Sequence, residues 1–301
     1  MKVLDIYILG GTGFVGHSIA NQLVDFGHQV SIITRRRERH RDLLVLPTLR
    51  LVQGNIFDQS FLNHELAGAD VVINLVGILN EFRGQPGFQM LHAELPRMIA
   101  EACRDQGVPR MLHMSALKAS SGGPSAYLRS KGSGEDRAHQ AGGQAVAVTS
   151  FRPSVIFGPA DSFTNRFATL LKFTPGFFPL ARADALFQPI YVEDVARAFV
   201  KSIDDYRTYG KRYALCGPDV YSLKQIVEQV SRVSRRPCRV LGLGPALSKL
   251  QAMVGELLPG KPISLDNIRS MQVDSICSEP FPEIFEMSLS RLEEIMPRYL
   301  G

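Results

Sequence analysis

The sequence predicts an α/β protein with a doubly wound parallel sheet and a smaller C-terminal lobe beside it. Apolar runs alternate with segments of helical spacing along the first half of the chain, as expected for strands and helices that form βαβ units. After about residue 152, proline-rich loops with short strands and helices replace this alternation. At 301 residues the chain could form one large domain or a domain with a smaller lobe, because single cores stop growing at roughly 250 to 300 residues, and the change of pattern favours the second. We therefore expect two units.

Six apolar runs are expected to form the strands of the sheet. The segments 15–26 and 96–106 between them carry apolar residues at spacings of three and four, which is typical of helices that cover a sheet. Each of these segments ends before a glycine, Gly27 or Gly107, which suits a helix C-cap. The expected strands are residues 3–9, 29–34, 50–53, 70–76, 110–114 and 145–152.

Composition and charge narrow the class of protein. A content of 45% hydrophobic and 21% charged residues is ordinary for a globular chain. There is no run of 18 apolar residues, and the first strand begins too early for a signal peptide, so we expect a cytoplasmic protein. The cysteines form no C-x-x-C pair and have no histidine at metal-ligand spacing. They are therefore expected to be buried thiols, with no metal site and no disulfide framework: Cys103, Cys216, Cys238 and Cys277.

The strongest chemical motif is GGTGFVG, residues 10–16, between an apolar strand and a helical pattern. Its three spaced glycines permit a tight turn, let the backbone approach a pyrophosphate and allow close helix packing. The helix N-terminus adds N–H donors and a favourable dipole for an anion. This context indicates a Rossmann-type dinucleotide site, and a glycine turn without a ligand is the alternative. The residues expected to contact NAD(P)(H) are Gly10, Thr12, Gly13, Phe14, Val15 and Gly16.

The end of the second expected strand favours NADP(H), although NAD(H) is compatible with it. Thr34, Arg35 and Arg36 stand where an NAD-preferring site would place an acid. Arginine makes bidentate charged hydrogen bonds to phosphate, which suits the 2′-phosphate of NADP(H). A solvated basic start of a helix is the alternative. The arginine cluster at 35–41 could also indicate nucleic acid, but no aromatic stacking platform surrounds it, so we expect no nucleic-acid partner.

Tyr127 and Lys131 form the only Tyr-x-x-x-Lys pair in the chain, on a segment of helical spacing. Residues i and i+4 share a helical face, so both side chains can reach one nicotinamide ribose. An ammonium beside a phenol favours the phenolate, and a fall of the tyrosine pKa from near 10 to about 7 would take roughly 4 kcal/mol of differential interaction. Tyr127 could then exchange a proton with a substrate hydroxyl or carbonyl group.

Together these motifs resemble the extended short-chain dehydrogenases/reductases, often described as NAD-dependent epimerase/dehydratase-like. In that family a serine at the position of Ser115 hydrogen-bonds the substrate oxygen; a plain strand-end residue is the alternative here. The resemblance implies an NADP(H)-dependent oxidoreductase or epimerase/dehydratase-like enzyme with a Ser-Tyr-Lys site. Its small-molecule substrate is not specified by the sequence.

The resemblance also implies further cofactor contacts. Asn55 stands where the family has an aspartate that touches the adenine, and Ile56 follows it. An amide can still accept from the adenine amino group through its oxygen. The backbone of Val76 and Gly77 typically borders the cofactor. In the stretch FRPSVIFGP, the backbone of Pro153, Ser154 and Val155 is expected to lie against the nicotinamide.

The resemblance also suggests how the chain is divided. Residues 1–152 are expected to form the dinucleotide-binding domain and residues 153–301 the C-terminal lobe. The stretch FQPIYVEDVARAF matches a family segment that returns to the cleft, so about residues 185–200 should rejoin the first domain. Its Asp194 is expected to be structural, because an acid near a helix N-terminus satisfies N–H groups there.

Stretches such as DVVINLVGILNE and GVPRMLHMSALKA narrow the similarity to the group containing the nucleotide-binding accessory subunit of respiratory complex I and its bacterial relatives. The mitochondrial member holds NADPH tightly and is not known to turn it over. A non-catalytic accessory or assembly protein, associated with a respiratory complex, is therefore the alternative function. His92, where extended members often have asparagine, is expected to be a packed or solvated helix residue and not a catalytic acid.

An apolar stripe near the C-terminus has two interpretations. It is flanked by Lys249 and Lys261, and its spacing is typical of a helix packed in a core. Peripheral membrane binding is the alternative, which would suit a respiratory-chain role. The residues of the stripe are Leu247, Leu250, Val254, Leu257 and Leu258.

Overall fold

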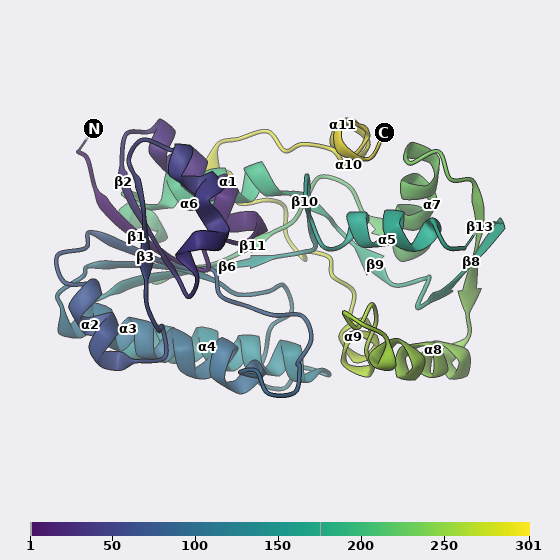
Figure 1. Ribbon diagram of the computed structural model, residues 1–301, viewed down its shortest axis with the longest axis horizontal. Helices are drawn as coiled ribbons and strands as arrows, with labels where there is room; N and C mark the ends of the chain where they lie inside the picture. Colours follow the sequence, from purple (N-terminus) through teal and green to yellow (C-terminus); the bar gives the residue numbers. More distant parts are fainter. Residues whose placement is uncertain (1, 175) are drawn as a thin grey trace.

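The computed structural model describes residues 2–174 and 176–301 and confirms the predicted fold class. Its centre is a seven-stranded sheet with the order β11-β6-β5-β4-β1-β2-β3, in which each neighbouring pair is parallel (Figure 1). The strand order reverses between β1 and β4, which places a crevice at the carboxyl ends of these strands. The strands are β1 (Asp5–Leu9), β2 (Gln29–Thr34), β3 (Leu49–Gln53), β4 (Val71–Asn74), β5 (Arg110–Met114), β6 (Ala147–Pro153) and β11 (Arg212–Leu215).

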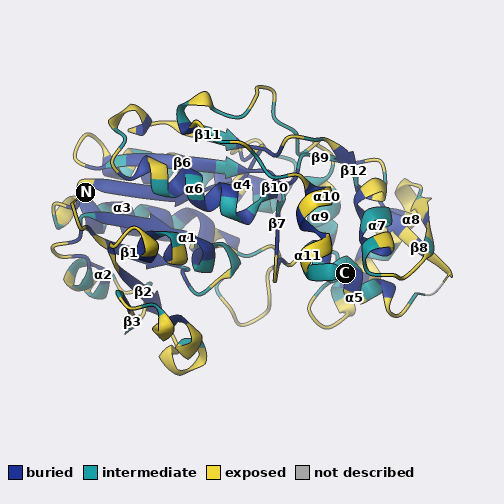
Figure 2. Ribbon diagram, turned by 90° about the horizontal axis from the view of Figure 1, so that it is seen from above, coloured by how far each residue is buried: buried dark blue, intermediate teal, exposed yellow. Residues whose placement is uncertain are grey.

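Helices cover both faces of this sheet (Figure 1). One face carries α1 (Phe14–Asp25) and α6 (Val192–Ser202), and the other carries α2 (Gln59–Glu65), α3 (Leu95–Asp105) and α4 (Ala126–Gly142). Side chains of a strand alternate between faces, so Ile6 and Ile8 of β1 belong to one apolar core while Tyr7 and Leu9 belong to the other. Figure 2 shows the central strands as buried and the outer loops as exposed.

The predicted strands agree closely with the observed ones where the alternation is regular. Both β2 and β5 have the predicted bounds, and the helices α1 and α3 end before Gly27 and Gly107, whose φ values are 81° and 70°. The strand β11 was not predicted, because it is a short strand at the edge of the sheet in which only Leu215 is fully buried. It pairs with β6, and α6 packs against α1. Two segments from beyond residue 152 therefore lie with the central sheet.

The remaining residues form a smaller lobe with its own apolar core. Four short strands extend from the central sheet into this lobe: β7 (Ile156–Phe157) pairs with β10 (Ile190–Tyr191), and β9 (Leu186–Phe187) pairs with β12 (Tyr221–Ser222). At the far end, β8 (Gly176–Ala181) lies parallel to β13 (Cys238–Leu243). The helices of the lobe are α5 (Thr164–Leu171), α7 (Leu223–Val233), α8 (Pro245–Leu257), α9 (Leu265–Ser270), α10 (Leu292–Ile295) and α11 (Pro297–Leu300).

The cysteines are not all thiols, which corrects the expectation from their spacing. Cys216 and Cys277 form a disulfide with a Cα–Cα distance of 6.1 Å, across a sequence separation of 61 residues. A pair so far apart leaves no local pattern in the sequence. Cys103 is a free buried thiol, as predicted, and Cys238 is free and partly buried. Within residues 2–174 and 176–301, no cluster of histidine, cysteine or acidic side chains suits a metal ion, and no helix could span a membrane.

Candidate functional site

The glycine turn between β1 and α1 contains two glycines that the fold itself requires. Gly10 has a φ of +80°, and a Cβ on it would lie 2.9 Å from the backbone of Leu75 and Val76. A Cβ on Gly16 would lie 2.4 Å from the carbonyl oxygen of Gly11. Both positions therefore exclude a side chain because neighbouring backbone already occupies the space.

Gly13 differs, because the protein itself leaves room beside it. It precedes α1 with extended backbone (φ −87°, ψ 175°), and its Cβ would meet only the carbonyl oxygen of Gly10, at 3.3 Å. Among the described residues, no side chain caps α1, and the first turn of this helix carries no acid. The open space and the uncapped N–H groups fit an anionic group such as a pyrophosphate, which would be favoured by the helix dipole.

Arg35 and Arg36 follow β2, which lies beside β1 in the sheet. Both side chains are exposed, and in the described part of the chain their guanidinium groups have no hydrogen bond or ion pair to another residue. The positive charge next to the glycine turn is therefore free to contact a ligand. This arrangement fits a phosphate group near the end of β2.

Some of the further predicted cofactor contacts already form hydrogen bonds within the protein. The Asn55 side-chain oxygen accepts from the Phe57 N–H at 3.1 Å, so it holds a local turn and has one lone pair left for a ligand. The backbone N–H of Val76 donates to Asn74 Oδ1 at 3.1 Å. Gly77 lies nearer the predicted catalytic pair, since its Cβ position is 3.5 Å from Lys131 Nζ.

A cavity of about 880 Å³ extends from the carboxyl ends of β4, β5 and β6 into the lobe. Nine of the residues predicted from the sequence line it: Phe14, Val15, Gly77, Ser115, Tyr127, Lys131, Pro153, Ser154 and Val155. The structure therefore brings the Ser-Tyr-Lys residues together with the predicted nicotinamide side of the site. The other predicted residues do not line this cavity: Gly10, Thr12, Gly13, Gly16, Arg35, Arg36, Asn55, Ile56 and Val76.

Tyr127 lies in the first turn of α4, and two side chains fix the start of that helix. Ser125 caps it by accepting from the Leu128 N–H at 3.0 Å. Asp266 of α9 accepts from the N–H groups of Ala126 and Tyr127 at 2.7 and 2.9 Å. An acid is favourable at a helix N-terminus, so α9 holds the tyrosine in place from the lobe. Asp266 was not predicted from the sequence, since no local pattern links it to residues so far away in the chain.

The charges at Tyr127 and Lys131 differ from the sequence prediction. Lys131 is buried, its Nζ donates to the Met114 carbonyl oxygen at 2.7 Å, and burial lowers its pKa to about 8 against the opposing effect of Glu135. Burial raises the pKa of Tyr127 to about 12. The predicted fall of the Tyr127 pKa toward neutrality is therefore wrong for the cofactor-free protein, because desolvation of the phenolate dominates.

Ser115 follows β5 and has a side-chain oxygen that is buried without a hydrogen-bond partner among the described residues. A buried hydroxyl without a partner is unfavourable. Ser115 is also one of the residues that line the cavity, so its unpartnered hydroxyl lies beside the space open to a ligand. This is the one unpartnered buried side-chain oxygen among the three predicted catalytic residues in the described chain.

His92 is a buried helix residue, as predicted. Its Nε2 accepts from the Ile78 N–H at 3.0 Å, and its Nδ1 is 3.0 Å from Ser130 Oγ. Burial lowers its pKa to about 2, so the ring is neutral and carries its proton on Nδ1. The ring also packs edge-on against Tyr127, with centroids 5.5 Å apart. His92 thus connects the loop after β4 to α4.

Asp194 is structural, as predicted, but through other partners. It is buried in the first turn of α6, where its carboxylate accepts from the Ser290 N–H at 2.7 Å and from Arg197. These partners replace the helix N–H groups expected from the sequence. A further contact with the C-terminal segment lies at the end of the sheet, where Ser154 Oγ donates to the Ser275 carbonyl oxygen at 2.7 Å.

The apolar stripe on α8 is not packed in a core, which corrects the simpler of its two interpretations. Leu247, Leu250, Val254 and Leu258 are 50 to 56% exposed, and all four line the cavity. Leu257 is 86% exposed and does not line it. The helical spacing of these apolar residues places them on one face of the helix, and that face forms a wall of the cavity.

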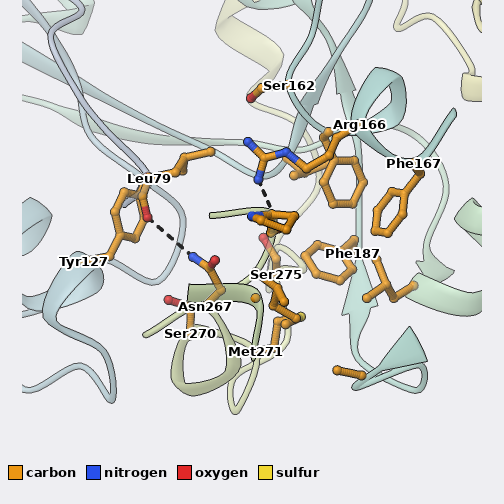
Figure 3. A pocket seen from close by; sticks show the side chains of 18 of the residues that line it. Leu79, Tyr127, Ser162, Arg166, Phe167, Phe187, Asn267, Ser270, Met271 and Ser275 are labelled. Carbon is orange, nitrogen blue, oxygen red and sulfur yellow. Dashed lines mark hydrogen bonds between the residues drawn. The ribbon is translucent and has the colours of Figure 1, made fainter. Parts of the chain in front are cut away.

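Figure 3 shows the lobe side of the cavity, with aromatic rings from Phe167 and Phe187 facing inward. The guanidinium of Arg166 donates to the Pro262 carbonyl oxygen at 3.2 Å. Asn267 of α9 donates to the Leu79 carbonyl oxygen at 3.5 Å, which connects α9 to the loop after β4. The cavity therefore has polar and apolar side chains at its Tyr127 end and largely apolar side chains at its lobe end.

Comparison with known proteins gives consistent similarities. Residues 6–216 match the model of the NAD dependent epimerase/dehydratase family. The NADH dehydrogenase [ubiquinone] 1 alpha subcomplex subunit 9 of Arabidopsis thaliana is 32% identical over 90% of this chain and 70% of its own length. The same subunit of Mus musculus is 33% identical over 76% of this chain, which spans only 61% of the mouse protein. The ceramide reductase of Caulobacter vibrioides is 28% identical over 81% of this chain and 73% of its own length.

Solved structures share the fold at low sequence identity. The structure of Pal from Bacillus thuringiensis has a TM-score of 0.76 at 15% identity and covers 99% of this chain and 98% of its own. The Bordetella bronchiseptica enzyme WbmH, solved in complex with NAD⁺, has a TM-score of 0.68 at 18% identity and covers 99% of this chain and 97% of its own. These similarities confirm the Rossmann-type sheet and cover nearly the whole chain, including the smaller lobe.

Proposed function

Because the chain belongs to the NAD dependent epimerase/dehydratase family, we propose that it is an NADP(H)-dependent oxidoreductase that interconverts a carbonyl compound and the corresponding alcohol. The observation that carries this proposal is the buried, unpartnered hydroxyl of Ser115 in the cavity that Tyr127 and Lys131 also line. A purely structural serine would have a hydrogen-bond partner there.

The residues present fit a bound dinucleotide. The space beside Gly13 and the uncapped start of α1 suit the pyrophosphate. Arg35 and Arg36 suit a 2′-phosphate, because their charges have no partner among the described residues. This supports NADP(H) over NAD(H), although a solved structural neighbour holds NAD⁺. When bound, NADPH supplies a hydride to the carbonyl carbon.

The chain's own residues handle the proton and the substrate oxygen. Ser115 donates a hydrogen bond to the carbonyl oxygen, and the neutral Tyr127 hydroxyl donates its proton there as the alcohol forms. A pKa of about 12 keeps the tyrosine protonated, which is the form needed for reduction. Lys131 contributes an ammonium that can hydrogen-bond a ribose and stabilise the phenolate left after proton transfer.

The test is NADPH consumption by the purified protein with a panel of aldehydes and ketones, followed by absorbance. We expect consumption with at least one carbonyl compound and a loss of at least tenfold in Ser115→Ala. Threonine at this position, in Ser115→Thr, is the matched control because it keeps the hydroxyl. Equal activity in the alanine and threonine variants would contradict the role of Ser115.

A second candidate is a non-catalytic accessory or assembly protein of a respiratory complex, which could involve peripheral contact with a membrane. It is favoured by the 32 to 33% identity to subunit 9 of the plant and mouse NADH dehydrogenase alpha subcomplex. This function predicts tight nucleotide binding with no NADPH consumption for any carbonyl compound. It also predicts that the protein co-purifies with a respiratory complex from native membranes.

A further inference from the structure

The cavity extends beyond its Ser-Tyr-Lys end into the lobe. Its volume of about 880 Å³ lies near the upper end of the roughly 300 to 1,000 Å³ typical of small-molecule pockets. It begins at Gly77, Ser115 and Tyr127, at the carboxyl ends of the sheet, and reaches α8 in the lobe. A compound that places a carbonyl group at Ser115 therefore has a continuous channel for the rest of the molecule.

The lobe side of this channel is apolar. Aromatic side chains from α5 and β9, including the labelled Phe167 and Phe187 of Figure 3, line this side together with aliphatic side chains of α8. Burial of hydrocarbon against such a wall is favourable, by about 0.8 kcal/mol for each methylene group. The principal apolar residues are Phe163, Phe167, Phe187, Leu247, Leu250 and Val254.

The polar groups on the lobe side are mostly bonded to the protein itself. Gln251 donates to the Pro179 carbonyl oxygen at 2.8 Å and accepts from the Ala181 N–H at 2.9 Å. Ser270 Oγ donates to Ser125 Oγ at 2.8 Å. Among the described residues the lining holds no carboxylate, and Arg166 is its single charged side chain in the lobe. A sugar or nucleotide would lose its hydration there without enough polar partners in return.

We propose that the substrate is a carbonyl compound with a long uncharged hydrocarbon chain, which lies along α8 while its carbonyl group lies at Ser115 and Tyr127. This inference rests on the proposed oxidoreductase function. The reaction is balanced: the carbonyl compound, NADPH and one proton give the alcohol and NADP⁺. The proton on the new hydroxyl comes from Tyr127, which is reprotonated from solvent.

The α8 wall offers a matched pair of variants for the test. Leu250 lines the cavity, whereas Leu257 is on the same helix, is 86% exposed and lies outside the cavity lining. Leu250→Gln and Leu257→Gln therefore make the same chemical change, the first inside the proposed binding cavity and the second outside it. Because Leu250 is itself 52% exposed, its replacement should leave the fold intact, which circular dichroism and the melting temperature would verify.

Binding of the hydrocarbon chain is measured without cofactor. Straight-chain alcohols from butan-1-ol to dodecan-1-ol displace the uncharged fluorescent probe 1-aminoanthracene. The protein has no tryptophan, so emission from that residue does not overlap with the emission of the probe. We expect affinity to rise about fourfold for each added methylene group. We expect Leu250→Gln to weaken dodecan-1-ol binding about tenfold and Leu257→Gln to leave it unchanged. Affinity independent of chain length, or equal effects of the two variants, would overturn the proposal.

The matching aldehydes then separate this inference from the proposed function. If the alcohols bind with the expected chain-length dependence but no aldehyde consumes NADPH, the apolar binding site stands and the oxidoreductase function fails. If short aldehydes are reduced as efficiently as dodecanal, the oxidoreductase function stands and the long-chain substrate is overturned. If kcat/KM rises with chain length and falls in Leu250→Gln, both are supported.

Discussion

Replacement of Gly13 by valine separates nucleotide binding from folding, because the protein leaves space at this position that only a ligand would use. The backbone conformation, with φ −87° and ψ 175°, is one that valine adopts without strain. The nearest atom to a Cβ would be the Gly10 carbonyl oxygen at 3.3 Å, so a shift of a few tenths of an ångström suffices. We therefore expect Gly13→Val to lower the free energy of unfolding by less than about 1 kcal/mol.

The effect on binding should be far larger. A side chain at position 13 would fill the space beside the start of α1 and separate the pyrophosphate from its N–H donors. Loss of two hydrogen bonds to a charged group, at about 1.5 to 3 kcal/mol each, corresponds to a roughly 150- to 25,000-fold weaker affinity. Titration of NADPH by its fluorescence would measure this change.

A matched control is Gly16→Val, where a Cβ would lie 2.4 Å from the Gly11 carbonyl oxygen. This variant should lose both melting temperature and NADPH affinity, whereas Gly13→Val should keep a melting temperature within about 3 °C of the parent protein. Unchanged NADPH affinity in Gly13→Val would refute the position of the site. A large loss of melting temperature in that variant would refute the argument from open space.

Three other predictions concern the phosphate, the lysine and the disulfide. Arg35→Ala with Arg36→Ala should weaken NADPH by roughly 1 to 3 kcal/mol and NADH little, in parallel fluorescence titrations; equal losses would remove the basis for NADP(H) preference. Lys131, with a pKa of about 8, carries its proton below that pH, so NADPH affinity should fall as pH rises from 7 to 9, and Lys131→Met should remove this dependence. Cys216→Ser should lower the free energy of unfolding by about 2 to 4 kcal/mol in urea titrations, because the disulfide closes a loop across a sequence separation of 61 residues. The control Cys238→Ser should change this free energy little, because Cys238 is a free thiol. Four reactive thiols in the unreduced, denatured protein would contradict the disulfide.

Much of the fold was predictable because local rules and the tertiary structure agree there. The glycine turn lies between a buried strand and an amphipathic helix, and the strands β2 and β5 follow continuous apolar runs. The strand β11 escaped prediction because an edge strand with partial burial has weak patterning. The disulfide escaped because Cys216 and Cys277 meet only after the chain returns across the end of the sheet.

The grouping of Ser115, Tyr127 and Lys131 at one cavity was predictable from the sequence, but the pKa values of the tyrosine and the lysine were not. The i, i+4 spacing places Tyr127 and Lys131 on one face of α4, and both line the same cavity with Ser115. Burial, which raises the tyrosine pKa to about 12, depends on packing that the spacing does not contain. The role of Asp266 at the start of α4 likewise depends on the position of α9 in the lobe.

We propose that the dinucleotide and Tyr127 act together in one site, a claim that the Tyr127→Phe variant can test. The change removes one hydroxyl that makes no hydrogen bond to a described residue, so the fold should be unaffected. Turnover of the best carbonyl substrate should fall roughly 100- to 10,000-fold, because the proton donor is lost. NADPH affinity should fall by no more than about 0.5 to 1.5 kcal/mol, the worth of one hydrogen bond. Turnover that survives in Tyr127→Phe at the level of the parent protein would contradict the claim.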